Sequence, residues 1–397
     1  MAPFDMNQQK TRFPRHIGGL DVTVHAQIYD LKADWLRLEQ TGYATYYQSY
    51  AWCQAWLESV AERSSVTVAV ICGRDLSGAA CFIIPLQISQ RFGVGFLQWL
   101  SAGEANYCFG IFDRRADAAY WPDWFDAHVS QILALVENYD VVCFYNMPKR
   151  LFGFDNPLGS LGRFASANQS FITHLTHDYD ALLQHKRSPK SIGKMRRRDT
   201  RLEELGPLEF QVLAGGESAE IALQEALRDK QYQLAQIGVH SFATEQVQDY
   251  FGLLLKQPVE GLDRLYVFRL LQNGKTISSS VGAVKAGCFW LLILSMAPDA
   301  PLQFSPGDYL LRKIIAWSCA NNIAHFDFSI GHSNYKQLWM DEEVELRDHF
   351  GARTLKGLPI AAAFLFYHTF KRMIKNQPAI KSAFFAIRKF FAGHKVK

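Results

Sequence analysis

The sequence lacks several features that would assign it to a common class of protein. No apolar stretch approaches the ~20 residues that a membrane-spanning helix requires. No Gly-x-Ser-x-Gly and no His-Glu-x-x-His motif is present, which disfavours serine hydrolases and zinc proteases. The start of the chain has no basic head followed by an apolar stretch, so we expect no secretion signal and a cytoplasmic protein.

The cysteines also lack a recognisable pattern. The seven cysteines form no Cys-x-x-Cys pair and no spacing typical of metal ligands. They fall mainly within apolar runs, which predicts buried thiols in a reducing compartment. We therefore expect no metal cofactor.

The sequence is rich in apolar and aromatic residues. Of 397 residues, 49% are apolar, and Phe (29), Tyr (16) and Trp (9) are frequent enough to build a large core. The length suits two lobes of similar size.

Charge is unevenly distributed along the chain. The formal net charge is +4, yet residues 357–397 contain no Asp or Glu. Their basic residues interleave with apolar and aromatic ones at near-helical spacing, as in a helix that lies on an anionic membrane surface. A terminal helix that docks its aromatics on the protein body fits equally well, and nucleic acid is an unlikely partner. The basic residues of this segment are Lys371, Arg372, Lys375, Lys381, Arg388, Lys389, Lys395 and Lys397.

A second basic cluster lies between residues 186 and 201, where Asp199 is the one acid. Pro189 suits the first turn of a helix through this segment. Such a density of cations would attract phosphates, although one helix cannot turn all of them to one side. A phosphate or nucleotide site and a plain charged surface are the two interpretations. The cations are Lys186, Arg187, Lys190, Lys194, Arg196, Arg197, Arg198 and Arg201.

The order of helix-like and strand-like segments is similar in the two halves of the chain. In each half, segments with helical spacing precede consecutive strand-like runs. Asn273-Gly274, between two such runs of the second half, is a strong hairpin signal. Consecutive antiparallel strands argue against a doubly wound parallel sheet. We therefore predict an α+β fold with two tandem lobes, each a mixed, largely antiparallel sheet flanked by helices.

We expect four regions along the chain. Residues 1–20 form an irregular N-terminus, 21–165 the first lobe, 166–355 the second lobe, and 356–397 a basic amphipathic helical tail.

Ser305-Pro306-Gly307 predicts the start of a helix. Ser305 is placed to cap the helix and Pro306 to occupy its first position. Gly307 leaves the backbone N–H groups unscreened, so this helix start suits a pyrophosphate. An ordinary capped helix is the alternative interpretation.

The most specific motif runs from residue 326 to residue 339. Phe326-Asp327-Phe328-Ser329-Ile330-Gly331 is followed by Tyr335-Lys336 and Trp339, an FDF-x-x-G-x-x-x-YK-x-x-W pattern. With the preceding Ser-Pro-Gly turn and the basic helix that carries Arg197, Arg198, Arg201 and Gly206, it resembles the FemAB-like branch of the GNAT acyltransferase superfamily. The resemblance is to the CelD-like, cellulose-biosynthesis-type acetyltransferases, and it covers roughly residues 28–350.

The resemblance implies that both lobes are GNAT-like. It also implies transfer of an acyl group from acetyl-CoA or another acyl-CoA to an amine, on a small-molecule or glycan acceptor such as an amino sugar of an exopolysaccharide or envelope glycan.

On this interpretation, residues 305–307 and the basic helix would bind the donor. Ser305, Gly307, Lys336, Arg197 and Arg198 are the expected donor-binding residues.

Three residues of the closing motif are candidates for the chemistry. Asp327 would accept a proton or orient the amine, or else pair with Lys336. Tyr335 would place its hydroxyl on the leaving thiolate, or pack with Trp339 on one side of a short helix. His332 stands where the family often has an acid. It would replace that base, or be only a surface loop residue, or else the site would have lost activity.

Two other functions compete with this one. One is an aminoacyl-tRNA-dependent transferase of the FemAB type, for which the basic cluster would hold RNA. The other is a non-catalytic GNAT-fold module of a glycan-assembly complex at the membrane.

Overall fold

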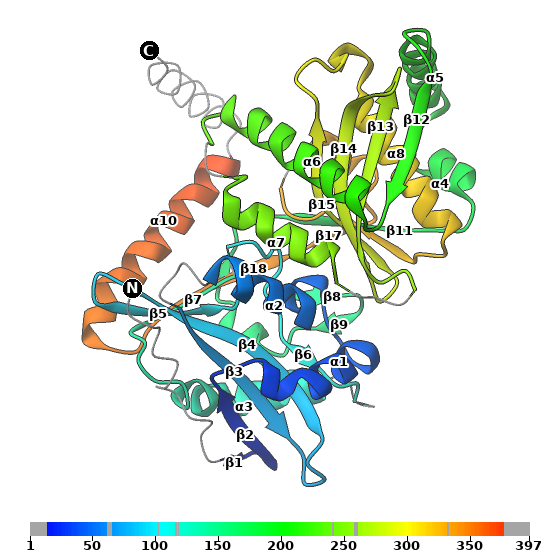
Figure 1. The fold of residues 1–397 in the computed structure, drawn as a ribbon. Coiled ribbons are helices and arrows are strands. Elements are labelled where there is room, and N and C mark those ends of the chain that lie inside the picture. Colours follow the sequence, from blue (N-terminus) through cyan, green and yellow to red (C-terminus); the bar gives the residue numbers. More distant parts are fainter. Residues whose placement is uncertain are drawn as a thin grey trace. The chain divides into compact units, whose positions relative to one another are not determined.

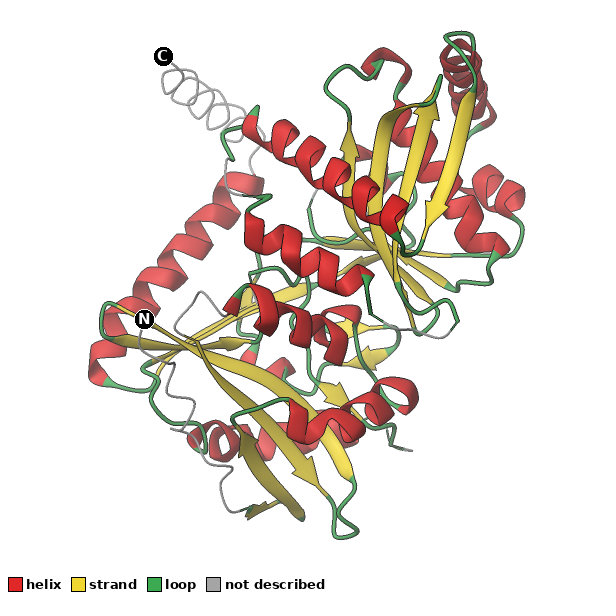
Figure 2. Ribbon diagram, in the orientation of Figure 1, coloured by secondary structure: helices red, strands yellow, loops and turns green. Residues whose placement is uncertain are grey.

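The chain folds into two compact units, each built on one sheet. The computed structural model describes residues 14–61, 66–101, 103–115, 117, 119–239, 242–257, 261–331 and 333–376. The first unit combines residues up to 168 with residues 344–373, and the second unit contains residues 169–343. Both sheets are mixed and mainly antiparallel, with helices packed on them, which confirms the predicted α+β fold (Figures 1 and 2).

The second unit is built on a sheet with the order β12-β13-β14-β15-β16-β11-β17. β15 and β16 are parallel, and the other described neighbours from β12 to β11 are antiparallel. The predicted hairpin between β13 and β14 is confirmed, because Asn273 and Gly274 both have positive φ, as a two-residue turn of this kind requires. The strands are β11 (Ser170–His174), β12 (Leu208–Leu213), β13 (Leu265–Gln272), β14 (Lys275–Lys285), β15 (Cys288–Met296), β16 (His325–Asp327) and β17 (Glu342–Val344).

Helices pack on both faces of this sheet. Helices α6 (Glu217–Ala235) and α7 (Glu245–Leu255) lie on one face, while α8 (Pro306–Ala320) and α4 (Tyr179–Lys186) lie on the other (Figure 1). The basic segment forms α5 (Pro189–Glu203), which begins with Pro189 as expected. The apolar side of α8 supplies buried leucines and isoleucines to the core of the second unit.

The first unit has a sheet with the order β1-β2-β3-β4-β5-β7-β18-β10. β5 and β7 are its parallel pair. Its strands are β1 (Arg15–Ile17), β2 (Leu20–His25), β3 (Val66–Arg74), β4 (Ala80–Arg91), β5 (Val94–Trp99), β7 (Val141–Pro148), β10 (Phe164–Ala165) and β18 (Leu346–Ala352), and β6 (Ile111–Phe112) pairs with β4 off this path. The helices are α1 (Lys32–Thr41), α2 (Tyr50–Ser59) and α3 (Tyr120–Ala134).

The chain returns to the first unit after it completes the second. Strand β18 pairs with β7 and β10, and α10 (Leu358–Asn376) packs Phe364 and Leu365 against the sheet of the first unit. This differs from the expected division, which assigned residues up to 355 to the second lobe and treated the tail as separate. The physical reason is that the edge of β7 needs a strand partner, which β18 supplies. The remainder of the tail lies outside the described residues.

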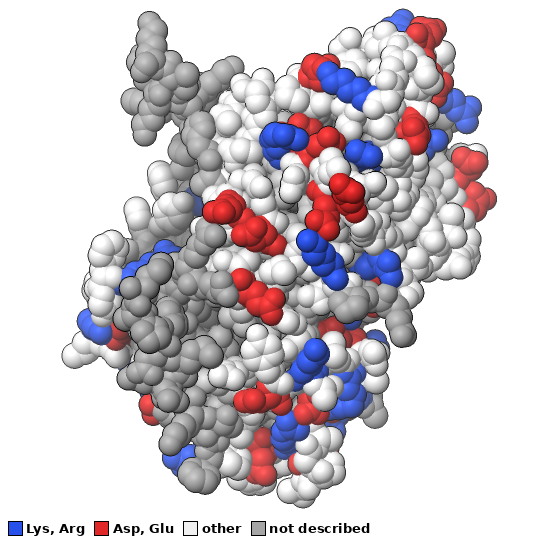
Figure 3. Space-filling model, viewed as in Figure 1, with Lys and Arg blue, Asp and Glu red and all other residues white. Residues whose placement is uncertain are grey.

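All seven cysteines are buried free thiols, as predicted. Across the described part of the chain, no helix is both long and apolar enough to span a membrane. On the face drawn in Figure 3, basic and acidic side chains are interspersed.

Candidate functional site

The parallel strands β15 and β16 separate after three residue pairs. Their register runs from Cys288 opposite His325 to Trp290 opposite Asp327. Strand β15 continues to Met296, and its other edge pairs with β14 along its whole length. Beyond Trp290, β15 therefore has an edge that β16 does not cover, and backbone amides along such an edge can pair with an extended ligand that carries amides.

The turn after β16 is fixed to the point where the strands separate. Ser329 has a left-handed backbone (φ 59°) and donates its hydroxyl to the carbonyl of Leu291, the first residue of β15 beyond the paired segment. The N–H of Ser329 donates to Oδ1 of Asp327 at 2.6 Å. Asp327 is fully buried, so its carboxylate holds the turn from inside the protein. The structure therefore shows Asp327 as an anchor of this turn.

Lys336 lies against the same turn. Its ammonium group donates to the carbonyl oxygens of Ser329 at 3.0 Å and Ile330 at 2.9 Å, and only 7% of the residue is exposed. Gly331 next to this turn has positive φ (110°), a backbone conformation that favours glycine. The predicted contact between Lys336 and a donor phosphate would require Nζ to leave both carbonyls.

Burial lowers the pKa of Lys336 to about 8. The carboxylate of Asp327 opposes this effect and raises the pKa, while the charge of Lys230 lowers it further. Lys230 belongs to α6 and donates to the carbonyl of Leu294 at 3.0 Å, and burial lowers its pKa as well. Two desolvated lysines and one buried carboxylate therefore share the separated end of β15 and β16.

The start of α8 lies beside Met296, the last residue of β15. Pro306 occupies the first turn as predicted, but the prediction that the Ser305 side chain caps the helix is wrong. Ser305 has a left-handed backbone (φ 56°), and its hydroxyl accepts instead from Nη1 of Arg198 at 3.0 Å. A Cβ on Gly307 would meet Met296 Sδ at 3.3 Å, so the glycine allows the helix to start close against β15.

Helix α5 is tied to α8 by a buried ion pair. Arg312 of α8 donates to both carboxylate oxygens of Asp199 at 2.9 and 2.6 Å, and to Asp308 at 3.1 Å. Asp199 is therefore the structural partner of α8 within the basic cluster. This arrangement places Arg198, the neighbour of Asp199, at the helix start.

The other predicted site residues differ in their exposure to solvent. Arg197 is exposed, and its Nε donates to the carbonyl of Gly193 in its own helix. Tyr335 lies in α9 (Asn334–Gln337), where burial raises the pKa of its hydroxyl and its ring packs against the core. Trp339 is fully buried. His332 lies outside the described residues.

The sequence did not identify Lys230 or Arg312 as members of this site. Lys230 occurs in an ordinary amphipathic helix and Arg312 on the largely buried α8, so neither stands in a motif. Among the described residues, no group of three or more His, Cys, Asp and Glu could hold a metal ion.

Comparisons with known proteins place a family match in the second unit. Residues 189–337 match the family model described as the acetyltransferase (GNAT) domain. None of the curated proteins compared matches this chain.

Several solved structures match most of this chain. FemX is 9% identical with a TM-score of 0.55, and the similarity covers 85% of this chain and 98% of FemX. L-PGS from Bacillus licheniformis is 13% identical with a TM-score of 0.48, covering 86% of this chain and 97% of that one. A tandem GNAT protein from the clavulanic acid biosynthesis pathway is 10% identical with a TM-score of 0.40, covering 84% and 98%.

The similarity to FemX shows a shared fold over most of both chains, and the family match lies within the second unit. The match to the acetyltransferase (GNAT) domain covers residues 189–337, and it supports an acyltransferase.

Proposed function

We propose that the protein transfers an acyl group from acyl-CoA, with acetyl-CoA the first candidate, to an amine. The observation that supports this most strongly is that the uncovered edge of β15 leads directly to a helix start with an adjacent guanidinium group. Phosphates bind at such a helix start, because its N–H groups point at them and the helix dipole favours negative charge. Arg198 adds a charged donor there.

The separated strands give the donor arm a path of suitable length. From Leu291 to Met296 the strand advances five residues, or roughly 16 Å at about 3.3 Å per residue. The pantetheine arm of CoA carries two amides that can pair with the uncovered edge of β15. With the phosphates at Gly307 and the arm along β15, the thioester would lie near Ser329 and Lys336.

Lys336 and Asp327 would then take part in transferring the proton that the amine loses. The amine nitrogen attacks the thioester carbonyl, a C–N bond forms, the C–S bond breaks, and the sulfur leaves as thiolate. Neutral Lys336 accepts the proton that the amine loses, and the carboxylate of Asp327 stabilises the ammonium that forms. The proton then passes to the thiolate, so that the products are an amide and CoA thiol. Tyr335 is the proposed relay, because its hydroxyl would donate to the thiolate and take the proton that Lys336 holds.

The acceptor we propose is an amino sugar of an exopolysaccharide or envelope glycan, as the CelD-like resemblance of the closing motif implies. We also propose that α10 places the enzyme at an anionic membrane surface. Phe366, Phe370 and Met373 are each more than half exposed on one side of α10, at i, i+4 and i+7. Lys371 and Arg372 follow Phe370 directly, and no acid occurs after residue 356.

The first test is binding of acetyl-CoA to the full chain by calorimetry, with CoA release measured as free thiol when glucosamine is added. Arg198→Ala should weaken binding at least tenfold, because a charge-assisted hydrogen bond to phosphate is worth about 1.5–3 kcal/mol. Arg196→Ala, an exposed cation two positions away, is the matched control and should bind as wild type does. Binding that is equal in all three proteins would contradict the assignment of the helix start.

A second candidate function is aminoacyl transfer from tRNA. It is favoured by the exposure of six cations along α5, a surface that suits a polyanion. If acetyl-CoA does not bind and ribonuclease treatment removes amine acylation from an extract supplied with the purified chain, this second candidate replaces the first. The exposed cations are Lys190, Lys194, Arg196, Arg197, Arg198 and Arg201.

A further inference from the structure

Two histidines lie opposite each other on neighbouring strands of the second unit. His174 of β11 and His325 of β16 are direct partners in the antiparallel register of these strands. In the next pair, the N–H of Leu175 donates to the carbonyl of Ala324 at 2.8 Å. Hydrogen-bonded and non-hydrogen-bonded pairs alternate along antiparallel strands, so the two histidines form a non-hydrogen-bonded pair. The Cα atoms of such a pair are only about 4.5 Å apart, which brings the side chains close together on one face.

The two imidazole rings face each other with one nitrogen each. Nδ1 of His174 lies 3.1 Å from Nδ1 of His325, whereas the ring centroids are 5.1 Å apart. A Zn–N bond is about 2.0–2.1 Å long, so two imidazole nitrogens on one ion lie roughly 2.9–3.4 Å apart when the angle at the metal is about 90–110°. The observed separation of the two nitrogens falls within this range, so the pair has the spacing of two ligands to one metal ion.

The protonation of the two rings also suits a metal ion. Between neutral imidazoles, one Nδ1 donates to the other only while its ring carries the proton on Nδ1. When both rings carry their protons on Nε2, both Nδ1 lone pairs are free to bind a metal. Burial, and next the charge of His174, lower the pKa of His325, which favours the neutral form that metal ions bind.

The surroundings of the pair leave it accessible. His174 is exposed, and His325 is partly exposed at the start of β16. Asp341 fixes the backbone of β11 at this point, because its Oδ2 accepts from the N–H of His174 at 2.9 Å, while its Oδ1 accepts from Lys186. Since the described residues include no group of three potential ligands, water would complete the coordination of an ion at this pair.

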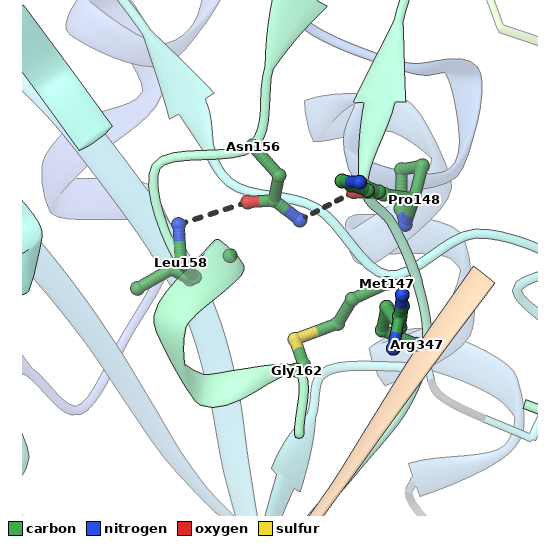
Figure 4. Close-up of a pocket in the computed structure, with 8 residues that line it drawn as sticks. Met147, Pro148, Asn156, Leu158, Gly162 and Arg347 are labelled. Atoms are coloured by element: carbon green, nitrogen blue, oxygen red, sulfur yellow. Dashed lines mark hydrogen bonds between the residues drawn. The ribbon is translucent and has the colours of Figure 1, made fainter. Parts of the chain in front are cut away.

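A cavity in the first unit shows a polar group that is not available in this way. The cavity is about 230 Å³ in volume and is lined by Met147 and Asn156 among others (Figure 4). Asn156 donates to the carbonyl of Pro148 at 2.9 Å and accepts from the N–H of Leu158 at 3.0 Å, so a ligand would have to break its bonds to the backbone. The contact between the two histidines joins side chains alone, so a metal ion can replace it while the strands stay paired.

We propose that His174 and His325 form a binding site for a divalent transition-metal ion of the kind that imidazole prefers, such as Zn²⁺. Each Nδ1 would give its lone pair to the ion, and each ring would keep its proton on Nε2. The ion would join β11 to β16 and so stabilise the second unit. Because the two histidines are 151 residues apart along the chain, no local spacing in the sequence predicts this site. Neither histidine takes part in the proposed transfer reaction, so the metal site does not depend on that reaction.

The test is titration of the metal-free full chain with zinc chloride by calorimetry, with thermal stability measured on the same samples. Wild type should bind zinc with a micromolar Kd and gain thermal stability, because an ion that binds the folded state stabilises it. His174→Gln and His325→Gln each leave one imidazole ligand. Each variant should raise Kd at least tenfold, the equivalent of about 1.4 kcal/mol, and should lose the gain in thermal stability.

His185→Gln, which changes an exposed histidine of α4, is the control and should bind zinc as wild type does. Calcium should not bind at the pair, because this ion prefers oxygen ligands. Absence of zinc binding by the wild type would overturn the proposal, as would a Kd that His174→Gln leaves unchanged. An equal loss of affinity in His185→Gln would also overturn it, because the ion would then be held elsewhere. Acetyl-CoA binding is measured separately, so the metal site and the transfer reaction can fail independently.

Discussion

At the scale of single residues, the pKa of Lys336 makes the proposed proton transfer measurable. Burial lowers it from 10.5 to about 8, so the amine is protonated below pH 8 and becomes neutral above it. If neutral Lys336 accepts the proton, kcat should rise with pH and level off above a pKa near 8. Lys336→Met should lose both this rise and most of the rate, and a pH–rate profile of CoA release measures both.

Asp327→Asn tests whether the carboxylate of Asp327 influences the pKa of Lys336. Asparagine still offers an oxygen to the N–H of Ser329 but carries no charge, so the folded turn should survive. Without the carboxylate the pKa of Lys336 should fall further, and the rise in kcat should move to lower pH. A rise that stays at pH 8 would show that Asp327 does not set the charge of Lys336. Loss of transfer at every pH in a stable variant would show that Asp327 itself accepts the proton.

The stability of the folded protein should also depend on the pKa of Lys336, and its contribution should rise with pH. Between pH 8 and 10.5 the unfolded chain keeps its proton on Lys336 while the folded chain has lost it. The unfolded state therefore binds more protons, and the contribution of Lys336 to stability rises with pH across this interval. Below pH 8 both states are protonated, and the cost of burying the charge is fully present.

The residues of the site were predictable from the sequence only where they belong to the motif. Asp327 and Lys336 stand in the FDF and YK elements, and the structure brings them to one turn with the electrostatic coupling that the sequence offered as an alternative. Lys230 joins them from α6, 106 residues before Lys336 along the chain. No local pattern encodes such proximity, because it depends on how α6 packs against β15. The prediction that the Ser305 side chain caps α8 failed for a related reason. Its backbone has positive φ, which the identity of a serine in the sequence does not predict.

At the scale of elements, Arg312 links α5 and α8, the two helices of the proposed donor site. Arg312→Leu would leave the carboxylates of Asp199 and Asp308 without their cation. The free energy of unfolding should fall by about 3 kcal/mol, because breaking a buried pair leaves an uncompensated charge. Acetyl-CoA affinity should fall with it, since Arg198 reaches Ser305 only while α5 is held in place.

Chemical denaturation and calorimetry on the same samples measure the two effects of Arg312→Leu. Arg201→Leu is the control, because Arg201 is exposed on the same helix. If Arg312→Leu were as stable as Arg201→Leu, the ion pair would not hold the two helices together.

The long elements of both sheets follow from local patterns, and the short ones do not. Strands β13, β14 and β15 have long apolar runs, and the predicted Asn273-Gly274 turn joins the first two. Strand β11 is five residues long and lies between β16 and β17, which are its partners from about 150 residues later in the chain. A strand of this kind is stabilised by its partners and not by its own composition, so its pattern is weak.

At the scale of the whole molecule, the return of the chain to the first unit changes the interpretation of the tail. Residues Ile360 and Phe364 of α10 pack on the core of Phe96 and Val141, so this part of the tail is a structural helix of the first unit. The sequence predicted either a membrane helix or a docking helix. One side of α10 packs on the protein, as expected for a docking helix. Its opposite side exposes the large apolar groups that a membrane-binding helix requires.

This arrangement determines how membrane binding should be tested. Deleting the whole tail would remove core residues of the first unit, so loss of binding in such a protein would carry no information. Phe366→Ser combined with Phe370→Ser changes only exposed groups and should leave the thermal stability unchanged. Burial of two phenylalanine side chains contributes about 1.5–3 kcal/mol each, so the double variant should bind vesicles containing phosphatidylglycerol at least a hundredfold more weakly.

The control for the vesicle experiment is the wild-type chain with neutral phosphatidylcholine vesicles. Binding should be much weaker there, because the cations of the tail add about 1 kcal/mol each near an anionic surface. Raising the salt concentration should weaken binding to the anionic vesicles for the same reason. Equal binding of wild type and the double variant to phosphatidylglycerol vesicles would show that α10 does not meet the lipid. The exposed apolar side of α10 would then be a candidate surface for contact with another protein, because apolar groups gathered in one patch mark interaction sites.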